Sequence, residues 1–329
     1  ISRDLPFRSP TGGEIAGPLL DPPSDPTYPT SYSLPPFEAA NWKFQQRLDE
    51  ETTPVNILQL GGGILLALCK SGKVYSSTDY GRTWSLYSNI NPVATTNCST
   101  LIKLGSSSLL GVGFSSNTGD AYFYRSMDSG RTWVETTHSF PLKGGVTRAA
   151  YLGNNVIIIP IQWTSSFYTI FYYISTDLGL NWNDVNKDLG PDGVGMETVF
   201  SLGDGKVLGG VGGRIIVKST NYGQNWQIKA NFGGDNSHRF RSFCKAGSYI
   251  LAGLTGDAEI YRSEDEGESW TQISTLGSGK SVNWIEYMGN GILLAGTNDG
   301  HIWKATDYGV FWSDLGVVGS ETNCYQILR

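Results

Sequence analysis

Ser77-Thr78-Asp79-Tyr80-Gly81-Arg82-Thr83-Trp84 is the stretch that decides the fold, because its pattern returns along the chain. The pattern Ser-x-Asp-x-Gly-x-Thr-Trp recurs with variation at 126–133, 175–182, 219–226 and 263–270, and in degenerate form at 305–312. The tryptophans that end these stretches are 49, 49, 44, 44 and 42 residues apart. A period of about 40 to 50 residues is typical of a propeller or a solenoid, in which each repeat is one small structural unit.

Each position of the repeat has a local structural role. The carboxylate or amide can accept hydrogen bonds from backbone N–H groups of its own turn, and the glycine suits a backbone position with positive φ. The tryptophan is large enough to fill the space between neighbouring sheets. The alternative, six metal or catalytic sites, is disfavoured because a self-satisfied turn explains every position. The residues expected at the acceptor position are Asp79, Asp128, Asp177, Asn221, Asp265 and Asp307.

The array resembles the Asp-box, or bacterial neuraminidase repeat, of the sialidase-like β-propeller superfamily. That group includes sialidases, sortilin-type receptors, xyloglucan-cleaving hydrolases and photosystem II assembly factors. The resemblance implies four-stranded antiparallel blades in which the box joins the third and fourth strands, on the rim away from the usual binding face. We therefore predict an all-β propeller at residues 41–329, preceded by a proline-rich N-terminal arm at 1–40.

At each end of the chain, a segment outside the six repeats matches a single strand of a repeat. These two segments bear on the number of blades. Residues 323–328 match the first strand of a repeat, and Trp42 lies one period, 42 residues, before Trp84. Ring closure would pair such strands and remove their exposed edges. The prediction is a seven-bladed ring closed by both termini, with the arm at 1–40 contributing to the closing blade. A six-bladed ring with two accessory strands is the alternative.

Composition narrows the classes of partner. The net charge of −6 argues against nucleic acid, which needs a basic surface, and no apolar run approaches the roughly 18 residues of a membrane span. The four cysteines lack the paired spacing of a zinc site, so we expect no metal and no cofactor. For Cys98 and Cys324, which occupy equivalent repeat positions, a disulfide and two buried thiols are both open.

The sharpest enzymatic hypothesis is a sialidase, and the sequence disfavours it. By resemblance, the first arginine of that family belongs on the inner strand of the first blade, but this strand is expected at 55–60 and contains no arginine. The hairpin that would carry the acid/base is reduced to residues 70–73, without a carboxylate, so nothing there could protonate a leaving group. A wider glycoside hydrolase hypothesis needs two facing carboxylates. Its candidates are Glu197, Asp235, Asp257, Glu286 and Asp299.

Ligand-binding residues are expected on the loops opposite the repeat turns. Trp163 lies in the longest insertion of any repeat, and exposed aromatic side chains suit stacking on sugar rings or a protein hot spot. Packing of these aromatics against the neighbouring blade is the alternative. A loop at 231–239 and basic residues near it could form a mixed aromatic and basic site, although a solvated surface explains each charge equally well. The predicted binding residues are Trp163, Arg148, Arg214, His238, Arg239, Arg241 and Trp284.

These observations favour a non-catalytic binding or structural module over an enzyme. The expected partner is a glycan or a surface protein, with assembly into a larger complex. By analogy with propellers of adhesins and of phage or virion appendages, an extracellular, cell-surface or virion location is favoured. Two alternatives stay open: a glycoside hydrolase of the sialidase-like superfamily that uses a carboxylate pair, and an assembly-factor scaffold for a protein complex.

Overall fold

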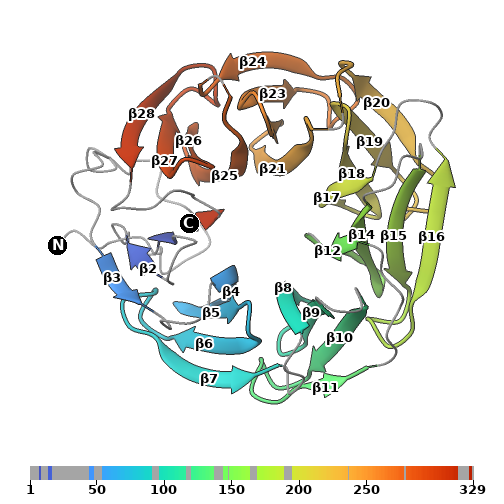
Figure 1. The fold of residues 1–329 in the computed structure, drawn as a ribbon, viewed down its shortest axis with the longest axis vertical. Coiled ribbons are helices and arrows are strands. Elements are labelled where there is room, and N and C mark those ends of the chain that lie inside the picture. The colour runs from blue at the N-terminus through green and yellow to red at the C-terminus, as the bar shows by residue number, and fades with distance from the viewer. Residues whose placement is uncertain are drawn as a thin grey trace.

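A ring of β-sheets forms the protein (Figure 1). The computed structural model describes residues 7–8, 14–16, 44–47, 54–90, 96–115, 120–136, 144–146, 148–163, 169–188, 195–235, 237–277, 279–317 and 326–327. All regular secondary structure in these ranges is β-strand. The sheets are arranged around a common centre as the blades of a propeller, so the predicted all-β propeller is confirmed.

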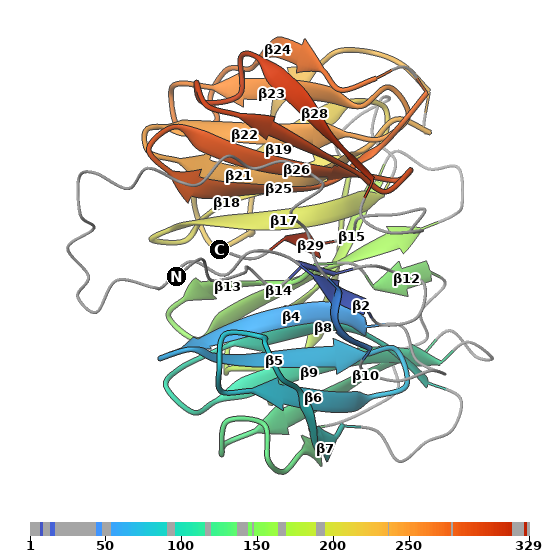
Figure 2. The same cartoon turned by 90° about the vertical axis from the view of Figure 1, so that its left-hand side faces the viewer.

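Six blades account for residues 54–317, and the chain passes through them in order. Within a blade, successive strands pair antiparallel and follow one another outward from the centre of the ring (Figure 1). Figure 2 shows the same blades from the side. Blade 1 has β4 (Pro54–Gly61), β5 (Ile64–Cys69), β6 (Lys73–Ser77) and β7 (Ser85–Asn89). Blade 2 has β8 (Thr96–Lys103), β9 (Leu109–Ser115), β10 (Ala121–Ser126) and β11 (Val134–Glu135). Blade 3 has β12 (Gly144–Val146), β13 (Ala150–Gly153), β14 (Val156–Trp163), β15 (Thr169–Ser175) and β16 (Asn183–Asp188), with its inner strand split in two.

The remaining three blades each have four strands. Blade 4 has β17 (Met196–Gly203), β18 (Lys206–Val211), β19 (Ile215–Ser219) and β20 (Gln227–Asn231). Blade 5 has β21 (Phe240–Ala246), β22 (Tyr249–Leu254), β23 (Glu259–Ser263) and β24 (Thr271–Thr275). Blade 6 has β25 (Val282–Gly289), β26 (Ile292–Thr297), β27 (His301–Ala305) and β28 (Trp312–Val317).

The core lies between neighbouring blades. The second strands β5, β18, β22 and β26 bury five consecutive residues each, because both faces of a blade pack against another blade. The tryptophans of the repeat join these layers, as predicted. Trp182 of blade 3, for example, stacks on Phe123 of blade 2 with the ring centroids 4.4 Å apart.

The six repeat turns, at 77–84, 126–133, 175–182, 219–226, 263–270 and 305–312, satisfy their own polar groups. In the first turn Ser77 Oγ donates to Asp79 Oδ1 (2.7 Å) and accepts from the backbone N–H of Gly81 (2.7 Å). Asp79 in turn accepts from the backbone N–H (2.9 Å) and the hydroxyl (2.6 Å) of Thr83. The acceptor residues of the other five turns, Asp128, Asp177, Asn221, Asp265 and Asp307, likewise accept from the backbone of their own turns.

The glycine of each repeat turn is required for two reasons. It has positive φ, 84° at Gly267 for example, which L side chains rarely adopt. It also packs against the second strand of the preceding blade: a Cβ at Gly267 would lie 2.8 Å from Leu208 Cδ2, and one at Gly223 would lie 2.3 Å from Ile158 Cδ1. A residue that shapes its own turn therefore also sets the distance between two blades.

The predicted seven-bladed ring is wrong, because the described residues form six blades. The terminal strands form a smaller sheet beside them, in the order β29 (Gln326–Ile327), β1 (Phe7–Arg8), β2 (Glu14–Ala16) and β3 (Phe44–Arg47). Its strands have two to four residues, whereas every blade contains a strand of at least seven. Nine prolines in residues 1–40 explain the difference, since proline cannot donate to a ladder. This sheet joins the two ends of the chain by pairing Phe7 with Ile327 and Arg8 with Gln326.

Three of the four cysteines, Cys69, Cys98 and Cys244, are buried free thiols. Burial raises the pKa of Cys98 to about 12, so this thiol is unreactive at neutral pH. Because Cys98 is a free thiol, it does not form the disulfide with Cys324 that the sequence left open. Cys324 itself lies outside the described residues. In the part of the chain that is described, no helix has the length and apolarity to cross a membrane.

Candidate functional site

A register shift recurs near the start of the inner strands. It lies on the face of the ring opposite the repeat turns. In five blades the pairing of the first strand with the second shifts register by one residue, as a β-bulge does. The residue that resumes the pairing is Asn56, Thr100, Thr198, Ser242 or Trp284. In blade 3, Arg148 forms an isolated bridge with Thr198 of the next blade and so takes the corresponding place.

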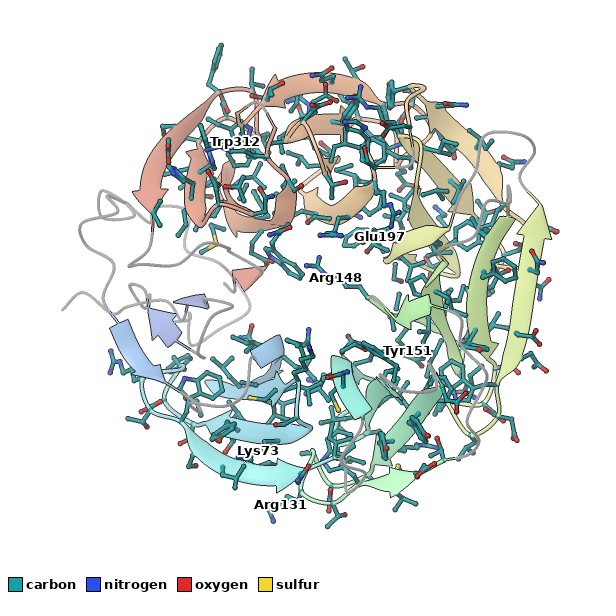
Figure 3. All side chains as sticks on the ribbon, in the orientation of Figure 1. Lys73, Arg131, Arg148, Tyr151, Glu197 and Trp312 are labelled. Carbon is teal, nitrogen blue, oxygen red and sulfur yellow. The ribbon has the colours of Figure 1, made fainter. Side chains whose placement is uncertain are left out.

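Small polar residues at this position join one blade to the next. Asn56 Oδ1 accepts from the backbone N–H of Leu101 (3.1 Å), and Ser242 Oγ accepts from that of Ile285 (2.9 Å). Arg148 and Trp284 break this pattern because they are large. Figure 3 shows Arg148 near the centre of the ring, and Trp284 contacts it there.

Arg148 and Trp284 meet there, although blades 3 and 6 lie on opposite sides of the ring (Figure 1). The guanidinium carbon of Arg148 lies 3.6 Å from the centroid of the Trp284 ring, a cation–π contact. Arg148 Nη2 also donates to the backbone carbonyl of Asn283 (3.2 Å). Asn283 itself is buried, and its side-chain nitrogen has no hydrogen-bond partner among the described residues.

A buried carboxylate orders two more arginines beside this contact. Glu197 on β17 has only 3% of its side chain exposed. Its Oε1 accepts from Arg241 Nε (3.0 Å) and Nη2 (2.8 Å), and its Oε2 accepts from Arg239 Nη1 (3.3 Å). Because a planar guanidinium bound by two hydrogen bonds has a fixed orientation, Glu197 fixes where Arg241 presents its charge. We call Arg148, Glu197, Arg239, Arg241, Asn283 and Trp284 the central cluster.

The charges of the central cluster are close enough to influence one another. Burial and the neighbouring guanidinium of Arg241 lower the pKa of Arg148 to about 9, although Glu286 and Glu197 act in the opposite direction. Glu286 also accepts from the indole Nε1 of Trp284 (3.2 Å). The central cluster and Glu286 together therefore contain three arginines and two carboxylates, and an additional negative charge beside Arg148 would be stabilised there.

A second group of charged residues adjoins the central cluster on blades 4 and 5. His238, the residue before Arg239, contacts Asp235 through Nδ1 (2.8 Å) and Asp257 through Nε2 (3.1 Å). Arg214 also pairs with Asp257, and its backbone N–H donates to the carbonyl of His238 (3.2 Å). These contacts bind the loop that precedes β21 to the hairpin turn that precedes β19.

The structure brings together four of the seven residues predicted to bind ligand: Arg148, Arg239, Arg241 and Trp284. Arg214 and His238 lie in the adjoining group, and Trp163 ends β14, paired with Gly144, with its side chain outside the described residues. Sequence reasoning missed Asn283 and named Glu197 only as a candidate acid. The signal that could have found them is the repeat register, which aligns Glu197, Arg241 and Asn283 at the bulge of three successive blades.

The other candidate carboxylates of a hydrolase are held by neighbours. Hydrogen bonds from Ser237 and His238 lower the pKa of Asp235 to about 2. Burial alone would raise the pKa of Asp299, but hydrogen bonds from Lys280 and Thr297 lower it overall. Within the described ranges, no cluster of three or more His, Cys, Asp or Glu side chains could hold a metal ion.

Comparison with solved structures shows similarity in fold. A structure of YCF48 bound to a D1 peptide superposes with a TM-score of 0.62 at 16% identity, covering 84% of this chain and 87% of that one. YCF48 from Cyanidioschyzon merolae gives 0.60 at 15% identity, covering 80% of this chain and 85% of that one. A GH74 xyloglucanase from Xanthomonas campestris gives 0.57 at 16% identity, covering 79% of this chain but 45% of the enzyme. The chain is a β-propeller.

Sequence comparison adds no family to this result. No protein-family model matches the chain, and no curated protein matches it. At 15 to 16% identity the structural similarity supports the fold alone, and the function of this propeller has to be argued from its own residues.

Proposed function

We propose that this propeller is a non-catalytic recognition module that binds an acidic segment of a partner protein at the central cluster. The observation that carries this proposal is that Glu197 holds Arg239 and Arg241. Arg241 and Glu197 lie close enough to Arg148 to shift its pKa, and Trp284 offers an aromatic surface beside Arg148. Arginine and tryptophan are the side chains most enriched where proteins bind one another tightly. We further propose that the repeat turns are Asp-boxes of the sialidase-like propellers, on the face opposite this site.

The distribution of charge supports an acidic ligand. The chain as a whole has a net charge of −6, so a basic group at the centre of the ring is a local exception to the overall charge. Such an exception attracts a negatively charged ligand locally, because charges farther than about 8 Å are largely screened at physiological salt. Guanidinium groups also bind carboxylates through two parallel hydrogen bonds, which adds orientation to attraction.

The carboxylates near the site favour binding over hydrolysis. A glycoside hydrolase needs one carboxyl group with a raised pKa to protonate the leaving group. Asp235 and Asp299 have lowered pKa values instead, and Glu197 is occupied by two arginines. The hydrolase alternative therefore lacks an evident acid among these three residues.

A protein segment is favoured over a glycan as the ligand. YCF48, whose fold is similar, has a solved structure in which it is bound to a D1 peptide. Neutral sugars bind mainly through stacking and neutral hydrogen bonds, whereas this site concentrates charged donors. A ligand with carboxylates uses these donors fully.

Binding of labelled peptides tests the proposal. We expect a fluorescein-labelled peptide of six glutamates to bind, measured by fluorescence anisotropy, and a peptide of six lysines or of alternating Gly and Ser not to bind. Arg148→Ala and Arg241→Ala should each weaken binding, while Arg131→Ala, which removes an arginine from the outer rim (Figure 3), should not. Equal binding of all peptides, or binding of xyloglucan oligosaccharides with hydrolysis, would contradict the proposal.

A further inference from the structure

Arg148 already has partners within the protein. The flat face of its guanidinium lies on Trp284, and its Nη2 donates to the carbonyl of Asn283. Both partners belong to β25, on the far side of the ring from β13, and Asn283 is 135 residues away in sequence. The guanidinium of Arg148, near the centre of the ring, is therefore bound to the protein itself.

Among the described residues, one pair of equivalent positions makes such a contact. At the position where the inner strands resume their pairing, Asn56 and Ser242 use their side chains to join neighbouring blades. Arg148 and Trp284 instead join blades that are not neighbours. A cross-ring contact between two large side chains is not needed to pack a propeller, because adjacent blades are held by the core between them.

We propose that the contact of Arg148 with Trp284 and Asn283 is autoinhibitory: it occupies the binding site, and an acidic ligand has to displace it. This inference rests on the proposed function, since it concerns the same site. Trp284 then acts as an internal competitor for Arg148 in addition to being part of the binding surface. The competition makes the site selective, because a single weakly held carboxylate does not replace both partners of the guanidinium.

The site keeps a hydrogen-bond donor available for the displaced state. The side-chain nitrogen of Asn283 is buried and has no partner among the described residues, which is uncommon for a polar group in a folded protein. An incoming carboxylate or peptide carbonyl that accepts from this nitrogen would compensate the loss of the bond between Arg148 and the Asn283 carbonyl. When a ligand displaces Arg148, the lost hydrogen bond to the Asn283 carbonyl is therefore replaced by a new one from the Asn283 side chain.

The variant Trp284→Leu tests whether Trp284 competes with the ligand for Arg148 or only contacts the ligand. Leucine keeps an apolar side chain but lacks the aromatic face that attracts a cation. If the contact is autoinhibitory, the labelled peptide of six glutamates should bind Trp284→Leu about 2- to 30-fold more tightly than it binds the wild type, the range that corresponds to a cation–π contact. Arg148→Lys, which keeps the charge but not the planar group, should bind more weakly than wild type, and Arg131→Ala should bind equally.

A measurement without ligand tests the contact directly. Phenylglyoxal modifies accessible guanidinium groups, and peptide mass spectrometry identifies the site. We expect Arg148 to be modified slowly in the wild type and several-fold faster in Trp284→Leu, with Arg131 modified equally in both. Thermal melting of each variant shows that it is folded.

The two hypotheses fail in different ways. Peptide binding that Arg148→Lys weakens, but that Trp284→Leu leaves unchanged or also weakens, would overturn autoinhibition and leave the proposed function in place. Absence of peptide binding in every protein would overturn the proposed function. In that case unchanged modification of Arg148 in Trp284→Leu would overturn the inference as well.

Discussion

Glu197 and Arg241 form a two-hydrogen-bond ion pair across the boundary between blades 4 and 5, with distances of 3.0 and 2.8 Å to one carboxylate oxygen. The carboxylate is buried, whereas 39% of the arginine side chain is exposed. The pair is thus anchored on one side and presented to solvent on the other. This asymmetry is suited to a binding residue that must keep its position while it remains accessible.

Glu197→Ala should destabilise the fold, because it leaves Arg239 and Arg241 near the centre of the ring without their carboxylate. We expect a loss of about 2 kcal/mol in the free energy of unfolding, less than for a fully buried pair since Arg241 is partly solvated. Urea denaturation measures it. Glu264→Ala is the control, because Glu264 makes an exposed ion pair with Arg262 and should change stability by less than about 0.5 kcal/mol.

Gly267→Ala should destabilise the protein through both roles of the turn glycine. The methyl group would meet Leu208 at 2.8 Å in a backbone conformation with φ of 84°. We expect a loss of about 2 to 4 kcal/mol from strain and overpacking together. Gly233→Ala separates the two effects, since Gly233 has φ of 67° with no atom within 4 Å of a Cβ. Equal losses for the two variants would show that inter-blade packing does not depend on the glycine.

The repeat turns should lose stability in acid. Hydrogen bonds from the side chain and backbone of Thr132 hold the pKa of Asp128 at about 2, below its ordinary value of 3.8. A lowered pKa in the folded state stabilises the fold above about pH 4, and this contribution is lost as the pH falls toward 2. Asp128→Asn should flatten the decrease of the urea midpoint between pH 5 and pH 2.

Asn221→Asp is the matched variant, because Asn221 fills the same position with an amide. It should make the acid-dependent decrease of the urea midpoint steeper. Identical pH profiles for the wild type and both variants would show that these turns do not contribute to acid sensitivity.

A substitution in the sixth repeat turn should stabilise the protein. Phe311 replaces the Thr, Ser or Asn that returns a side-chain hydrogen bond in four other turns, and 78% of Phe311 is exposed. Asp307 accepts hydrogen bonds from the backbone N–H groups of Val310 and Phe311. The Phe311 side chain has no polar group that could donate another. Phe311→Thr should stabilise the protein by about 0.5 to 1 kcal/mol, measured by urea denaturation. Leu86→Thr, at an exposed position of β7 outside the repeat turns, is the control and should give no gain.

The repeat turns could be predicted because each is a local structure. Ser77, Asp79, Gly81 and Thr83 interact within seven residues, so their types and spacing alone define the turn. The propeller followed from the period of these turns. The number of blades did not: extending the period back to Trp42 predicted seven, but the residues before it are rich in proline and form strands too short for a blade.

The sequence indicated several residues of the candidate site but not the contacts between them. Sequence reasoning placed Arg148, Arg239, Arg241 and Trp284 on the face opposite the turns, since basic and aromatic residues gather in those segments. It did not predict that Glu197 holds two of the arginines, because a carboxylate without a motif is indistinguishable from an ordinary surface residue. The pairing of Glu197 with these arginines depends on how β17 and β21, in neighbouring blades, are placed relative to each other.

The sequence by itself determined the repeating unit, because hydrogen bonds within a turn and apolar strands between turns depend on residues close together in the chain. Only the tertiary structure decided that Arg148 lies on Trp284. The two residues occupy the same position in two different repeats, and closing the ring brings these positions together from opposite sides. A contact that depends on how whole blades are arranged has no local signal, so no spacing in the sequence could reveal it.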